Sequence, residues 1–305
     1  MNKNALNNHL IGLILLFGVN ASVGADDDRT QGADKYSQPM PQTMRMDALV
    51  QQLTNKHQSH QIQTLEADDD RFLALYNKAV TRDSIGCVIL LPADNEHPDW
   101  PHTISPIRNQ LPDYSWCTIS IELPDITNRA QAVTSEAPSN DNEDAAELIL
   151  KEQNVINARI QASIDFAKSN NAQSIVLLGE KTGASYALNF LADNPNAAQA
   201  LVMIDIKAPE EASEYLIAQQ LININSPVLD YYSPLNMGRF NLWRKQAMNQ
   251  NSNNSRYLPI ESNNDVLDES NQQQLVQRVR GFLKQNTAQI NQRKTLSAFS
   301  KGLFY

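Results

Sequence analysis

Long apolar runs, cysteines and basic residues are all scarce in this chain of 305 residues. The one extended apolar stretch, residues 10–19, is short for a bilayer span, and no later segment approaches a transmembrane length. Two cysteines cannot supply the four ligands of a structural zinc site. Lys and Arg number 25 against 34 Asp and Glu. This charge balance argues against nucleic acid and anionic membrane surfaces as partners.

The N-terminus has the layout of a secretory signal peptide. Lys3 lies ahead of the apolar stretch, and the small residues Val23-Gly24-Ala25 precede the acidic run Asp26-Asp27-Asp28. We therefore expect cleavage after Ala25 and a periplasmic location in a Gram-negative bacterium, with secretion as the alternative. An uncleaved anchor would need a longer apolar span. The mature chain would keep 24 basic and 34 acidic residues, a net charge of −10 and no transmembrane span.

The two cysteines, Cys87 and Cys117, each begin an apolar run of the kind expected for a strand. In an oxidising compartment an even pair of cysteines is a candidate disulfide. The alternative is a pair of buried free thiols.

The organisation along the chain follows from composition. The polar and acidic composition of residues 26–43 is typical of a disordered linker. The segment Met44–Leu53 predicts a short helix, and alternating residues 61–65 and 71–76 around an Asp-rich turn predict an antiparallel hairpin at one edge of a sheet. We expect one domain over residues 44–286. We expect it to carry an acidic surface loop at 128–146 and to be followed by a basic tail at 287–305.

Short continuous apolar runs alternate with amphipathic segments in the rest of the domain. The runs predict buried strands at 87–91, 117–121, 175–178, 200–204, 227–232 and 256–260. The intervening segments predict helices at 143–168, 182–193, 211–222, 239–250 and 265–285. This alternation predicts an α/β fold with a doubly wound, mostly parallel sheet.

A series of short motifs in a fixed order resembles one known family. The motifs include Arg71–Tyr76, His97-Pro98-Asp99-Trp100-Pro101, Glu122-Leu123-Pro124-Asp125, Asn157-Ala158-Arg159-Ile160, Gly183-Ala184-Ser185, Asp230–Pro234 and Val279–Leu283. The chain resembles the uncharacterised bacterial family "domain of unknown function 3530" over about residues 45–285. That family belongs with the α/β-hydrolases, so the resemblance implies an α/β-hydrolase-like fold. It implies no established activity.

In an α/β-hydrolase the nucleophile lies on a sharp turn between a strand and a helix, written GxSxG. The matching segment here is Gly179-Glu180-Lys181-Thr182-Gly183, which keeps both glycines and places Lys181 where the serine belongs. A lysine at the start of a helix experiences a field that lowers its pKa, which would favour reactivity, whereas Glu180 opposes this effect. The alternative is a solvated lysine without a catalytic role.

The other catalytic groups of that fold are also missing from their usual places. The base is a His after the last strand, but the five His lie at 9, 57, 60, 97 and 102. Asp205 and Asp230 are candidate acids, without a His to orient. Pro92-Ala93 occupies the place of the oxyanion loop, and Pro lacks a backbone donor. We therefore assign no catalytic residue.

Three functional hypotheses remain open. The first is a non-catalytic protein that binds an unknown small ligand or envelope protein at the former active-site crevice, without a cofactor or a metal. Its candidate binding residues are Pro92, Asp94, Glu180, Lys181, Asp205 and Asp230. The second is a hydrolase or transferase that uses an unconventional site, such as Thr182 or His97. The third is a structural cell-envelope protein that makes contacts through the acidic loop or the basic tail. A metal site among Asp94, Glu96, His97, Asp99 and His102 has suitable ligand types but matches no known spacing.

Overall fold

The computed structural model describes residues 42–68, 70–81, 84–127, 148–251, 256–264, 271–287 and 289. These all belong to one compact unit that spans residues 39–305. The expected signal peptide at 1–25 and the acidic loop at 128–146 lie outside the described residues, as do most of the linker and of the tail.

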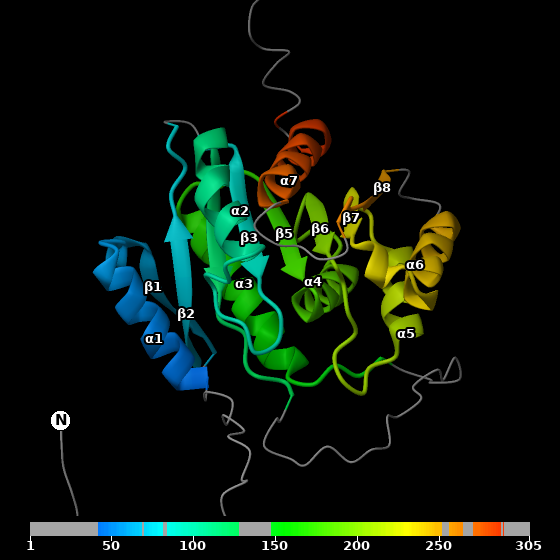
Figure 1. Ribbon diagram of the computed structural model, residues 1–305, viewed down its shortest axis with the longest axis horizontal. Coiled ribbons are helices and arrows are strands. Elements are labelled where there is room, and N and C mark those ends of the chain that lie inside the picture. Colours follow the sequence, from blue (N-terminus) through cyan, green and yellow to red (C-terminus); the bar gives the residue numbers. More distant parts are fainter. Residues whose placement is uncertain are drawn as a thin grey trace, which may run out of the picture. The chain divides into compact units, whose positions relative to one another are not determined.

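Eight described strands form a single sheet (Figure 1). In spatial order they are β1 (Ile62–Ala67), β2 (Asp70–Asn77), β4 (Trp116–Ile121), β3 (Gly86–Leu91), β5 (Ile175–Glu180), β6 (Ala200–Ile204), β7 (Val228–Tyr232) and β8 (Tyr257–Glu261). β1 and β2 form an antiparallel hairpin at one edge, and β2 also pairs antiparallel with β4. All other pairings are parallel. The predicted doubly wound sheet with its edge hairpin is confirmed.

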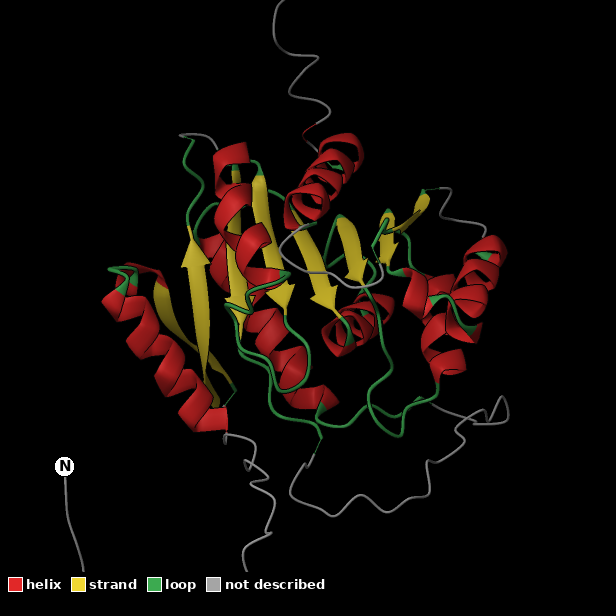
Figure 2. Cartoon of the chain, in the orientation of Figure 1, coloured by secondary structure: helices red, strands yellow, loops and turns green. Residues whose placement is uncertain are grey.

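Helices cover both faces of this sheet (Figure 2). They are α1 (Gln42–Asn55), α2 (Ile104–Gln110), α3 (Gln153–Ser169), α4 (Thr182–Asp193), α5 (Glu214–Gln219), α6 (Arg239–Gln250) and α7 (Gln272–Asn286). Four short 3-10 helices, η1 (Ser59–Gln61), η2 (Leu111–Tyr114), η3 (Gln220–Asn223) and η4 (Pro234–Asn236), complete the described elements. No helix of the described part has the length and hydrophobicity needed to span a membrane.

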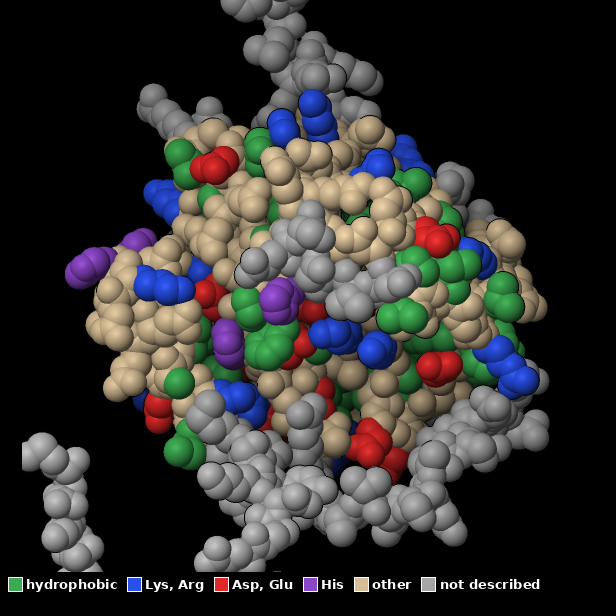
Figure 3. All heavy atoms as spheres, in the orientation of Figure 1, with side chains coloured by type: hydrophobic (Ala, Val, Ile, Leu, Met, Phe, Trp, Pro, Cys, Tyr) green, Lys and Arg blue, Asp and Glu red, His purple; other side chains and the backbone are tan. Residues whose placement is uncertain are grey.

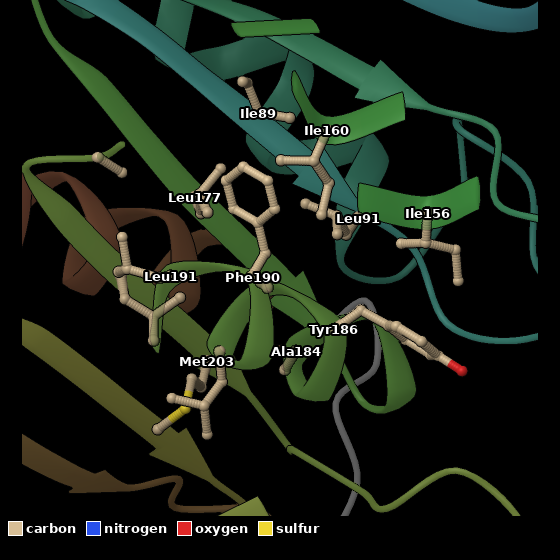
Figure 4. Close-up of a cluster of buried hydrophobic side chains, with 14 of the residues drawn as sticks. Ile89, Leu91, Ile156, Ile160, Leu177, Ala184, Tyr186, Phe190, Leu191 and Met203 are labelled. Carbon is tan, nitrogen blue, oxygen red and sulfur yellow. The ribbon is translucent and has the colours of Figure 1, made fainter. Parts of the chain in front are cut away.

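The core has two layers because the central strands are apolar on both sides. On one face, side chains such as Ile89, Leu91 and Leu177 pack against α3 and α4. Figure 4 shows Tyr186, Phe190 and Leu191 of α4 among these strand residues. On the other face, Val88 and Leu90 pack with residues of α2 and α7. Burial on both faces explains why these strands lack polar alternation.

The boundaries of three predicted elements need correction. α1 begins at Gln42, so the expected linker ends earlier than residue 43. The helix expected from residue 143 begins at Gln153 in the structure, because residues 148–152 are not helical and Glu152 has φ 56°. The helix expected at 211–222 is α5 followed by η3; Ser213 caps α5 by accepting a hydrogen bond from the Leu216 amide.

The two cysteines are register partners on neighbouring strands. Cys87 of β3 lies opposite Cys117 of β4, with 4.4 Å between their Cα atoms. The structure joins them in a disulfide, as expected from the sequence.

Candidate functional site

The sharp turn between β5 and α4 is present in the structure. Lys181 occupies its apex with φ 46° and ψ −115°, a conformation that is costly for a residue with a Cβ. A Cβ on Gly183 would lie 2.3 Å from the Pro92 carbonyl oxygen, and one on Gly179 would lie 2.3 Å from Cα of Ala184. Both glycines are therefore required by close backbone packing around the turn.

The Lys181 side chain is held by two carboxylates. Its Nζ lies 2.8 Å from Oε1 of Glu96 and 3.2 Å from Oε1 of Glu180. Thr103 donates its hydroxyl to the same Glu180 oxygen at 3.0 Å. We call Glu96, Thr103, Glu180 and Lys181 the elbow cluster. Its two carboxylates are almost entirely buried, whereas the Lys181 side chain is 34% exposed.

The fold shifts the ionisation of two members of the elbow cluster. Burial and the neighbouring Glu96 raise the pKa of Glu180 to about 7, against the opposing effects of Lys181 and Thr103. Burial by itself would lower the pKa of Lys181, but Glu180 and Glu96 outweigh it and the net shift is upward. The lowered pKa considered for a reactive Lys181 is therefore wrong, because the two carboxylates stabilise its ammonium form.

The loop after β3 has its amide donors engaged within the chain. Pro92 has no N–H, the Ala93 amide donates to Oε2 of Glu96 at 3.2 Å, and the Asp94 amide donates to Thr182 Oγ1 at 2.7 Å. The Asp94 carboxylate accepts hydrogen bonds from two further backbone amides, those of Ile126 and Thr127. This loop is the place where an α/β-hydrolase would offer an N–H to an oxyanion.

The remaining two candidate residues, one directly after β6 and the other inside β7, have different surroundings. Asp205, at the end of β6, accepts hydrogen bonds at Oδ1 from the Ser233 amide at 2.6 Å and from Asn236 Nδ2 at 2.8 Å. It lies at the carboxyl edge of the sheet and holds the loop that follows β7.

Asp230 does not belong to this edge. It lies inside β7 with no exposed surface, 2.9 Å from Nε of Arg244 and 2.5 Å from the hydroxyl of Tyr257. Its expected place at the crevice is corrected to a buried ion pair between the sheet and α6. The apolar neighbours of Asp230 in the sequence did not reveal that a partner arrives from a later helix.

The group of residues considered for a metal is divided among other contacts. Glu96 pairs with Lys181, and Asp99 pairs with the fully buried Arg108 at 2.7 Å. His97 packs edge-on against Trp100, with ring centroids 5.4 Å apart, and accepts the Asp99 amide at Nδ1. Burial lowers the pKa of His97, with Arg45 adding to the shift and Asp99 opposing it. Across the described residues, no three potential ligands converge to hold a metal.

Two features of the site could not be recognised from the sequence. Thr103 carries no motif, and Glu96 attracted attention only as a possible metal ligand. The fold brings Thr103 into contact with Glu180, 77 residues away along the chain, and Glu96 into contact with Lys181, 85 residues away.

Figure 3 shows acidic, basic and histidine side chains gathered in the middle of the visible face.

A separate hollow of about 510 Å³ lies at the start of α3. It is lined by residues 148–150 and 152–155, and includes none of the candidate binding residues.

A family model described as "Protein of unknown function (DUF3530)" matches residues 8–285. The chain belongs to the DUF3530 family. No curated protein matches this DUF3530 chain.

Solved structures share the fold of this DUF3530 protein at low sequence identity. A dienelactone hydrolase from Anabaena variabilis matches with a TM-score of 0.54 and 14% identity, over 75% of this chain and 100% of its own. Est1E from Butyrivibrio proteoclasticus matches with a TM-score of 0.52 and 12% identity, over 74% and 98% of the two chains. An esterase domain from Rhodothermus marinus matches with a TM-score of 0.51 and 12% identity, over 73% of this chain and 97% of its own. Together with the sheet topology, these matches show an α/β-hydrolase fold for the DUF3530 protein.

Proposed function

We propose that this DUF3530 protein is non-catalytic and binds a ligand or partner at the carboxyl edge of its sheet, around the elbow cluster. The observation that supports this proposal best is the turn between β5 and α4. Its strained backbone is present, but the side chain at its apex is an ammonium group paired with Glu96 and Glu180. A charged amine has no free electron pair with which to attack a carbonyl.

The surroundings of the elbow support the same proposal. Oxyanion stabilisation needs amide donors that point at the reacting oxygen. Here the Ala93 and Asp94 amides already donate to Glu96 and Thr182. The chain also has no His after residue 102 to serve as the usual base. The fold is present, but the groups that catalysis would need are either missing or already hydrogen-bonded within the chain. This combination favours a binding role over a catalytic one.

The alternative of an unconventional hydrolase rests on Thr182 or His97. Thr182 Oγ1 accepts the Asp94 amide, and His97 Nδ1 accepts the amide of Asp99 in its own loop. No described contact joins either side chain to a nucleophile–base pair, so we prefer the binding proposal. The structural-envelope alternative depends on residues 128–146 and on the tail, which lie outside the described residues except for positions 287 and 289.

The test is a search for turnover and covalent labelling with purified mature protein. We expect no adduct with a fluorophosphonate probe by intact mass, and no hydrolysis of p-nitrophenyl acetate above that of Lys181→Ala, Thr182→Ala and His97→Ala variants. The Lys181 variant removes the apex amine, and the other two remove the rival hydroxyl and imidazole. Turnover that any of these substitutions abolishes would overturn the proposal and identify the responsible group.

We also propose that the protein acts in the periplasm after removal of residues 1–25. The Cys87–Cys117 disulfide supports this location, because disulfides persist in oxidising compartments.

A further inference from the structure

Both carboxylate oxygens of Glu96 are occupied, one by a side chain of the β5–α4 turn and the other by an amide of the loop to which Glu96 itself belongs. Oε1 lies 2.8 Å from Nζ of Lys181, at the β5–α4 turn, and Oε2 accepts the Ala93 amide at 3.2 Å, just after β3. The Glu96 side chain is 8% exposed. One ammonium and one amide thus converge on a single carboxylate, and the charged contact is the stronger of the two.

The backbone next to the two donors is fixed by contacts that do not involve the Glu96 side chain. Gly183 packs directly on the Leu91 and Pro92 carbonyls, which fixes the β5–α4 turn against the end of β3. Glu96 itself arrives on a short turn, closed by its amide donating to the Ala93 carbonyl at 3.1 Å. The side chain of Asn95 in that turn has a buried Nδ2 atom without a hydrogen-bond partner among the described residues, and its φ is 61°. The turn that carries Glu96 therefore includes a residue with a positive φ and a buried polar atom, both of which cost free energy.

We propose that Lys181 and the Ala93 amide form a binding site for small carboxylates, which Glu96 fills from within the chain in this structure. This inference rests on the proposed function and names the ligand class of the same site. An external carboxylate binds by replacing the Glu96 carboxylate between the two donors.

The charge around the site selects a monoanion. Lys181 is the one cation that contacts Glu96 among the described ion pairs, and Glu180 lies beside it with Oε1 only 3.2 Å from Nζ. A dianion such as phosphate would face this second, deeply buried carboxyl group, whereas a carboxylate reproduces the charge and shape of Glu96. Lys181 is exposed enough, at 34%, for a solute to reach it.

The experiment is rescue of a Glu96→Ala variant by formate. The substitution removes the internal carboxylate and leaves the two donors facing the vacated volume. We expect the variant to have a lower Tm than the wild type, and formate to raise that Tm by about 2–4 °C, since a ligand that binds only the folded state stabilises it. Sodium chloride at equal ionic strength should have no such effect, and the wild type should respond less because Glu96 competes.

Two matched variants separate site binding from a general salt effect. Glu96→Gln fills the same volume and should not respond to formate. Glu96→Ala combined with Lys181→Ala lacks the cation and should lose the response. If Glu96→Ala does not fold, Glu96→Ser opens the same site, and the wild-type titration is compared with chloride.

The proposal is overturned if formate stabilises the folded variants no more than chloride does. Equal responses of the single and double variants would also overturn it. These outcomes are distinct from failure of the proposed function, because that test measures ester turnover and phosphonate labelling of the wild type.

Discussion

Burial and a neighbouring carboxylate both raise the pKa of the Glu180 side chain. It ends β5 almost completely buried, with Oε1 accepting from Thr103 and Oε2 without a hydrogen-bond partner in the described part of the chain. Burial and Glu96 raise its pKa from 4.5 to about 7, so the folded state binds its proton more tightly than the unfolded chain does. The stabilisation from this proton is full below pH 4.5 and is lost as the pH rises to about 7.

We therefore predict that Glu180→Gln flattens the pH dependence of stability. Gln keeps the shape and the neutral state at every pH, so the variant should avoid a loss on the order of 3 kcal/mol that the wild type undergoes between pH 4.5 and 7.5. Urea unfolding at several pH values measures this slope. Glu66→Gln, at an exposed position paired with Arg71, is the control. Parallel slopes for the wild type and Glu180→Gln would contradict the assignment.

Two glycines offer a second residue-level comparison. Gly183→Ala should destabilise the fold by about 1–3 kcal/mol, because its new Cβ would lie 2.3 Å from the Pro92 carbonyl oxygen. Gly281→Ala, inside α7 with no atom within 4 Å of the new Cβ, should stabilise it by about 0.5–1 kcal/mol. Chemical denaturation of both variants tests the pair; a destabilised Gly281→Ala or a neutral Gly183→Ala would show that the packing argument is wrong.

The contact between β7 and α6 depends on one buried ion pair. Arg244 is 1% exposed and Asp230 is fully buried; the Tyr257 hydroxyl from β8 completes the arrangement. Arg244 also lies over the ring of Phe240, 4.7 Å from its centroid. Such a pair is costly to break from one side, since the remaining charge stays buried.

We predict that Arg244→Met lowers the free energy of unfolding by about 3–5 kcal/mol. The double variant Arg244→Met with Asp230→Leu should recover much of this loss, because it leaves no unpaired charge. Unfolding in urea measures both. Arg71→Met, which breaks an exposed pair with Glu66, should cost no more than about 1 kcal/mol. A double variant no more stable than the single one would refute the desolvation argument.

Helix boundaries show where local pattern and tertiary contacts differ. The bounds of α4 and α6 follow the apolar periodicity of the sequence. Ile149 falls on the apolar side of the helix that the sequence predicts from residue 143. In the structure this side chain is 76% exposed and lies in a non-helical segment ahead of α3. That segment is held by tertiary contacts: Tyr186 donates its hydroxyl to the Lys151 carbonyl, and Lys151 Nζ reaches the Ile126 carbonyl. The apolar periodicity of a sequence contains no information about such contacts between distant residues.

The whole molecule carries a prediction about its compartment. Expressed with residues 1–25 in a Gram-negative host, the protein should be recovered from the periplasm with Asp26 as its first residue and with Cys87 and Cys117 oxidised. Without those residues it should stay in the cytoplasm with free thiols, because that compartment is reducing. Intact mass and thiol alkylation, with and without reductant, measure both properties. Periplasmic protein that retains residue 1, or that alkylates fully without reductant, would contradict this prediction.

The sequence by itself determined the sheet, its edge hairpin and the elbow with Lys181 at its apex. These follow from local information: doubly apolar runs, a period of 3.6 residues and two glycines at a fixed spacing. It also located Cys87 and Cys117 at the starts of neighbouring strands.

Only the tertiary structure decided how the charged residues are partnered. It moved Asp230 from the expected crevice into the core with Arg244, and it brought Glu96 and Thr103 to the elbow from a distant loop. The pKa shifts of Glu180 and Lys181 follow from burial and from the contacts within the elbow cluster. Partners and burial depend on contacts between residues far apart in the chain, so no local pattern contains them, and the character of Lys181 as a bound ammonium became visible only in the fold.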